Sequence, residues 1–143
     1  MTKIHNMKQR QYMALAPLLS LAGIFINPMA STLAPLVLYF IFRDKRPDVG
    51  TIALRTADLA FSIQLWLVLI SLAFMLAISM NLVVTSDVQQ MMGLATIIIL
   101  AIFLVSLAAA IYQSFKGKVY RYLFSFRIAE RVLNLVDKKR KAD

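Results

Sequence analysis

The sequence predicts an all-α integral membrane protein, and composition, the length of the apolar runs and the placement of charge are the three observations that predict it. Of the 143 residues, 60% are hydrophobic, and Asp58 and Asp87 are the only charged residues between positions 56 and 115. A water-soluble domain of this size does not tolerate such a composition. A hydrocarbon core about 30 Å thick needs about 20 apolar residues per helical span. We therefore expect residues 1–143 to form a single integral membrane domain.

Charge placement predicts the orientation of the chain. The 16 lysines and arginines lie before Met13, within residues 43–55 and from Lys116 onward, and none lies between the last two apolar runs. By the positive-inside rule, the basic N-terminal arm, the 43–55 loop and the basic C-terminal tail face the cytoplasm. We expect a multi-pass protein of the bacterial cytoplasmic (inner) membrane with both termini in the cytoplasm.

The first apolar stretch, residues 14–42, is predicted to form a short helical hairpin that turns at Asn27-Pro28. Two cytoplasmic flanks forbid a single crossing, and arms of about 14 residues at 1.5 Å per residue are only about 21 Å long. Proline lacks an N–H and pushes the preceding residue out of the helical region, which suits a turn. This charge pattern fits a re-entrant hairpin, which enters and leaves the membrane on the same side without crossing it. It fits equally well a hairpin whose two short arms both cross.

Two alternatives concern the same stretch. One is a secretory signal peptide, since basic residues precede the apolar run, but apolar sequence resumes immediately after the one small-residue candidate, Ala30. The other is one tilted span kinked at Pro28, because transmembrane helices tolerate proline. The kinked span would place the flanking basic residues on mixed sides of the membrane.

Two long transmembrane helices follow, at about residues 52–82 and 87–115. Asp48 or Thr51 is the candidate N-cap of the first. The second is preceded by the capping-box sequence SDVQ at residues 86–89, and Gly117 is placed to end it.

The last predicted element is an interfacial amphipathic helix at about residues 119–137. Its apolar and basic residues fall on opposite helical faces, and aromatic residues between 120 and 126 suit headgroup depth. This segment is either a binding surface for anionic lipid or a partner, or a plain topological anchor. The basic residues expected to contact lipid headgroups or a partner are Arg43, Lys45, Arg46, Lys116, Lys118, Arg121, Arg127 and Arg131.

The sequence offers few residues for chemistry. The chain has one histidine, His5, and no cysteine, and it shows no nucleophile elbow, P-loop or zinc-protease motif. We therefore expect no catalytic residue, no cofactor, no metal site and no nucleic-acid partner.

Asp58 is the exception, because an acid inside a membrane helix is a candidate functional residue. Arg55 lies three residues earlier on the same helical face and can neutralise it. Gln64 shares roughly that face and can extend a polar seam. Asp58 either fixes the hairpin against this helix through a salt bridge or takes part in proton or substrate transfer.

Three segments resemble a family of small bacterial membrane proteins of unassigned function, related to the channel subunit of the chloroplast inner-envelope (Tic-type) protein import translocon. They are APLVLYFIFRDKRPDV at 34–49, TADLAFSIQ at 56–64 and GKVYRYLFSFRI at 117–128. The matching positions are Pro35, Tyr39, Arg43, Asp44, Lys45, Pro47, Gly117, Tyr120 and Tyr122. The resemblance implies four helical elements with both termini cytoplasmic, while the family's Asn-Phe-Gln is replaced here by Asp58-Leu59-Ala60.

Two function classes remain open from the sequence. One is a non-enzymatic accessory or scaffold subunit of a membrane complex, related to protein translocation or assembly, that docks another membrane protein or a second copy. The other is a small homo-oligomeric transporter or channel with Asp58 and Gln64 lining its path.

Overall fold

The computed structural model describes residues 2–80, 85–122, 125 and 131–132. Within them the chain forms four helices, α1 (Thr2–Ile26), α2 (Pro28–Phe42), α3 (Pro47–Ser79) and α4 (Thr85–Phe115), and no strand. The predicted all-helical class is confirmed. Two of the helical segments, Pro47–Ser79 and Asp87–Phe115, are long and apolar enough to cross a membrane.

The helix boundaries differ from the predicted ones at four places. Helix α4 begins at Thr85 rather than at residue 87, so Ser86 lies within the helix and the expected capping box at 86–89 is wrong. Helix α1 begins at Thr2 rather than near residue 14, because no proline or glycine precedes Pro17 to interrupt it. Helix α3 begins at Pro47, since proline suits the first helical position. Arg46 therefore occupies its N-cap, and the expectation of Asp48 or Thr51 there is wrong. The described part of α3 ends at Ser79, short of the predicted residue 82.

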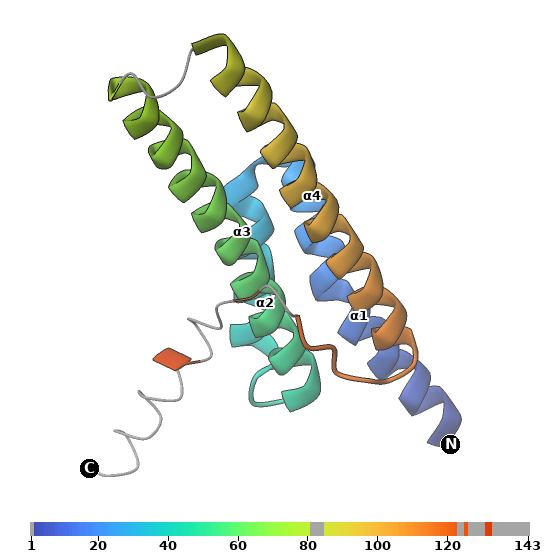
Figure 1. Ribbon diagram of the computed structural model, residues 1–143. Coiled ribbons are helices and arrows are strands. Elements are labelled where there is room, and N and C mark those ends of the chain that lie inside the picture. Colours follow the sequence, from blue (N-terminus) through green and yellow to red (C-terminus); the bar gives the residue numbers. More distant parts are fainter. Residues whose placement is uncertain (1, 81–84, 123–124, 126–130, 133–143) are drawn as a thin grey trace, which may run out of the picture.

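The α1–α2 pair packs along only part of the long helices. Helix α1 contacts each of the other three helices, α2 packs against α1 and α3, and α3 also contacts α4. Figure 1 shows α1 and α2 beside the lower parts of α3 and α4, whose upper parts continue past the α1–α2 turn. A cross-section of the described part of the molecule thus contains four helices at one end and two at the other.

Two apolar clusters hold this arrangement together. The first joins α1 and α2 to the start of α3, and the second joins the middle of α3 to the C-terminal half of α4 and to the tail. Their buried members are Met13, Ala16, Leu38, Val49, Ile52 and Ala53 in the first cluster, and Leu59, Ala60, Ile63, Phe103, Leu107, Ala110 and Tyr122 in the second.

The segment after α4 differs from the predicted amphipathic helix where the structure describes it. Residues 118–122 are not helical, and Tyr122 is buried in the second apolar cluster. A helix beginning at 119 is therefore wrong, because the chain leaves α4 in an extended path that brings Tyr122 back onto α3. Residues 131–132 are helical, and most of the remaining predicted range, up to 137, lies outside the described residues.

Candidate functional site

Most of the polar groups of the α1–α2 turn form hydrogen bonds within the turn itself. The Asn27 side chain accepts a hydrogen bond from the Met29 N–H at 2.9 Å, as an N-cap does. The Asn27 N–H donates to Gly23 O, and Asn27 O accepts from the Ala30 N–H. The Ser31 hydroxyl donates to Pro28 O at 2.6 Å. A turn satisfied in this way meets the main condition for placing non-helical backbone at membrane depth.

Helices α1 and α2 approach at backbone distance just below this turn. A Cβ placed on Gly23 would lie 2.6 Å from Ser31 N and 2.8 Å from Ala30 C, so only glycine fits. One turn earlier on α1, the buried Ser20 hydroxyl donates to Ser31 O at 2.9 Å. Small residues allow membrane helices to pack this closely. The turn at Asn27-Pro28 therefore folds α2 back along α1.

Gln64 joins α3 to the turn. Its side-chain amide nitrogen donates to Pro28 O and lies 3.4 Å from the Ser31 hydroxyl oxygen. This contact places the tip of the hairpin level with Gln64, partway along α3. The predicted polar role of Gln64 takes this form in the structure: its amide holds the hairpin tip.

The residues around the turn are apolar and outward-facing. Phe25 and Ile26 are 85% and 82% exposed, and Met29 is 67% exposed. Such side chains at a loop tip would be unfavourable in water, whereas lipid tails suit them. The tip of the hairpin thus has an apolar outer surface, and the polar groups of its turn are hydrogen-bonded to one another.

A second polar cluster lies where the tail returns to α3. The hydroxyls of Thr56 and Tyr122 are 2.9 Å apart and buried, and Thr56 also donates to Ile52 O. Arg55 Nη1 lies 3.4 Å from Tyr120 O, and the Tyr120 and Tyr122 rings meet edge to face. Burial raises the pKa of Tyr122 above its usual value, although the hydrogen bond to Thr56 opposes this. The phenol is thus neutral at physiological pH.

Gly117 produces the reversal that brings these tyrosines back. Its φ is +74°, the left-handed conformation that glycine adopts without strain. The Lys118 N–H donates to Gln113 O and the Gly117 N–H to Ser114 O, which is the Schellman pattern. The prediction that Gly117 ends the last long helix is correct.

Asp58 is 2% exposed and its backbone carbonyl accepts a hydrogen bond from the Ser62 hydroxyl. Asp58, Arg55 and Gln64 all lie on α3, but Arg55 reaches the tail and Gln64 reaches the hairpin tip. These polar side chains of α3 therefore contact two different segments of the chain, at two different positions along the helix. Pairing of Asp58 with Arg55 stays a prediction.

The wide end of the molecule is basic and hollowed. Gln9 donates to the Asp48 carboxylate at 3.0 Å, and Gln9 also lines two hollows of about 250 and 280 Å³. The hollows are lined by Gln9, Arg10, Met13, Asp48, Lys116 and Gly117 in one case, and by Gln9, Lys45, Arg46 and Pro47 in the other.

The basic residues predicted to contact headgroups gather at this end as far as the structure describes them. Arg43 pairs with Asp44 at 3.4 Å, Arg46 lies over the Tyr12 ring and Lys116 over the Tyr112 ring. The side chains of Lys118, Arg121 and Arg131 are exposed, and Arg127 lies outside the described residues. None of these contacts identifies a ligand.

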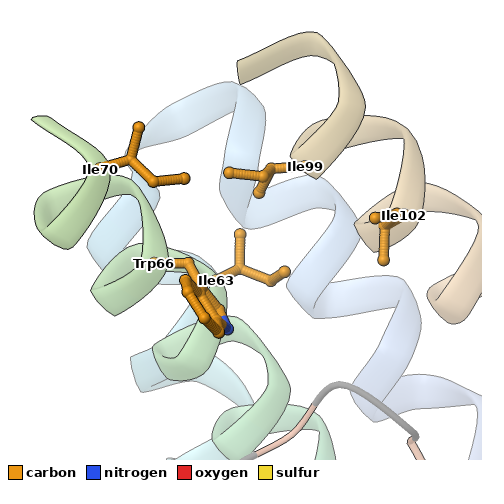
Figure 2. Close-up of a pocket in the computed structure, with 5 residues that line it drawn as sticks. All are labelled: Ile63, Trp66, Ile70, Ile99 and Ile102. Carbon is orange, nitrogen blue, oxygen red and sulfur yellow. The ribbon is translucent and has the colours of Figure 1, made fainter. Parts of the chain in front are cut away.

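An apolar hollow of about 180 Å³ opens between α3 and α4. Its lining side chains, Ile63, Trp66, Ile70, Ile99 and Ile102, converge on the gap between the two helices (Figure 2). Periodicity did not single out this feature, because apart from Gln64 the residues of both helices here are apolar on every face. The described residues bring together no group of three or more His, Asp or Glu side chains.

Two apolar helices of membrane-spanning length, an apolar hairpin and a basic end define a small helical membrane protein. Within that class, the chain belongs to the magnetosome magnetite crystal formation protein family (MamF_MmsF), whose model matches residues 8–129. No curated protein and no solved structure matches the chain. The expected membership in a family of small bacterial membrane proteins is thereby confirmed, whereas the relation to the import translocon stays a prediction.

Proposed function

We propose that this chain is a non-enzymatic scaffold subunit of the magnetosome membrane that acts in magnetite crystal formation. The observation that carries the proposal is the family match over residues 8–129, which includes the hairpin, both long helices and the returning tail. The matched region thus contains both helices that are long and apolar enough to cross a membrane. A role at the membrane follows more directly from it than a role in solution.

The proposed placement has α3 and α4 crossing the bilayer and the α1–α2 hairpin entering it from the basic side without crossing. Its support is the turn that satisfies its own polar groups and the exposed apolar residues around it, Phe25, Ile26 and Met29. The basic residues at the wide end then lie at the headgroups of the cytoplasmic leaflet, where anionic lipids attract them.

A scaffold role fits the way in which the polar side chains are used. Gln64 holds the hairpin tip, Thr56 holds Tyr122, and Ser20 holds Ser31. These contacts fix helices to one another and leave the outer faces of α3 and α4 apolar and exposed. Such faces can pack against another membrane protein or a second copy through van der Waals contact.

The direct test is deletion of the gene in a magnetite-forming host, followed by electron microscopy of crystal number and size. We expect altered crystals, restored by the intact chain and by Gly93→Ala, whose new Cβ would meet nothing within 4 Å. Unchanged crystals after clean deletion would contradict the proposal.

Co-purification from native membranes in mild detergent separates the scaffold from the transporter alternative. A stoichiometric protein partner supports the scaffold. A homo-oligomer without partners that conducts ions in liposomes, and that loses conduction on Asp58→Asn while keeping its stability, would favour the transporter instead.

A further inference from the structure

Burial along the described parts of the two long helices is concentrated at one end, with Val88 as the exception. The buried residues of α3 all lie from Val49 to Ile63. In α4 the buried residues are Val88 near its start and then Phe103, Leu107, Ala110 and Ser114 in its C-terminal half. The α1–α2 hairpin and the tail cover the N-terminal part of α3 and the C-terminal part of α4. At the opposite end of the molecule only α3 and α4 are present among the described residues.

The hairpin tip divides the apolar length of α3 into nearly equal parts. From Ile52 to Gln64, which binds the tip, the helix rises about 18 Å, and from Gln64 to Ser79 it rises about 22 Å. The total of about 40 Å exceeds a hydrocarbon core of about 30 Å, so the long helices tilt. The hairpin consequently occupies about half of the apolar depth, which corresponds to one leaflet.

The protein therefore displaces different amounts of lipid in the two leaflets. Each helix with its side chains is about 10 Å wide, and four lie at the basic end against two at the other (Figure 1). An inclusion that widens one leaflet is accommodated at lower cost where that leaflet is already expanded, which is the convex face of a curved membrane. The same reasoning underlies the curvature sensitivity of interfacial helices.

We infer that this chain prefers, and at high density promotes, membrane that is convex toward its basic end. The inference rests on the membrane placement proposed above and not on a role in magnetite formation. Charge alone does not produce this preference, because Arg10, Arg43 and Lys116 attract anionic headgroups on flat and curved membrane alike.

The test measures sorting of the full chain between a giant vesicle and a thin membrane tether pulled from it. The chain has no cysteine, so a dye can be attached to a single Met7→Cys, at a side chain that is 62% exposed on α1. Reconstitution gives both orientations, and an impermeant quencher added outside separates them. Each orientation is the matched control of the other, with identical sequence, fold and lipid.

We expect a tether-to-vesicle ratio above one, relative to a lipid dye, for molecules with the basic end outside, and below one for the opposite orientation. The difference should grow as the tether narrows. Equal ratios in the two orientations, or the reverse order, would overturn the inference. The crystal phenotype after gene deletion is measured separately, so failure here leaves the result for magnetite formation unaffected.

Discussion

Gly23→Ala tests the contact between α1 and α2 on which the hairpin depends. The new Cβ would meet Ser31 N, Ser31 Cα and Ala30 C at 2.6, 2.7 and 2.8 Å. All three atoms are backbone, so no side-chain rotation relieves the clash. Since carbon atoms pack at about 3.5–4.0 Å, the two helices must separate by about 1 Å.

The cost follows from that displacement. Overpacking costs about 1–3 kcal/mol, and the Ser20–Ser31 hydrogen bond, now 2.9 Å long, would be stretched and would lose about 1 kcal/mol. Alanine recovers about 0.5–1 kcal/mol relative to glycine in a helix. We expect Gly23→Ala to lower the free energy of unfolding by about 1–3 kcal/mol.

Gly93→Ala is the matched control, since nothing lies within 4 Å of its new Cβ, and it should be neutral or stabilising by up to about 1 kcal/mol. Reversible unfolding of both variants in one detergent can be followed by far-UV circular dichroism and by the fluorescence of Trp66, the single tryptophan. Equal stability of the two variants would refute backbone contact between α1 and α2 at Gly23.

Three further predictions concern the α3 residues and the tail. Thr56→Val leaves the buried Tyr122 hydroxyl without its partner and should cost about 1–3 kcal/mol, whereas adding Tyr122→Phe should recover part of that loss in the same unfolding assay; no recovery would argue against the pair. Asp58→Asn and Arg55→Gln should each lower stability, and the double variant should regain much of it because no lone charge remains; strictly additive losses would argue against pairing. Deletion of residues 129–143 should leave membrane insertion intact, as shown by resistance to carbonate extraction, because both spans and the hairpin remain; loss of insertion would make the tail structural.

The helices were predictable because their signals are local. Apolar run length identified α3 and α4, and the backbone chemistry of proline identified the break between Asn27 and Pro28. The boundaries were less accurate at α1, whose polar first turns carry no apolar signal, and at α3, where Pro47 itself is the first helical residue.

The contacts between elements were not predictable, because they depend on which apolar faces meet. Ser20 and Gly23 set the spacing of α1 and α2, although nothing in the sequence around them distinguishes them from other small residues of an apolar helix. Tyr122 was placed in an interfacial helix from its aromatic neighbours, whereas it is 3% exposed and bound to Thr56. A contact 66 positions apart in the chain leaves no periodic signal in either segment.

Accessibility mapping of the chain in native membranes tests the hairpin placement most directly. Reporters are inserted after residue 12, within 44–50, at the C-terminus and within 85–90, so that they flank the hairpin and each long helix. We predict that the first three read cytoplasmic and the fourth external, because α1 and α2 enter and leave on the basic side. A reading in which residue 12 and residue 46 lie on opposite sides of the membrane would show that the first apolar stretch is a single kinked span, and the hairpin account would be wrong.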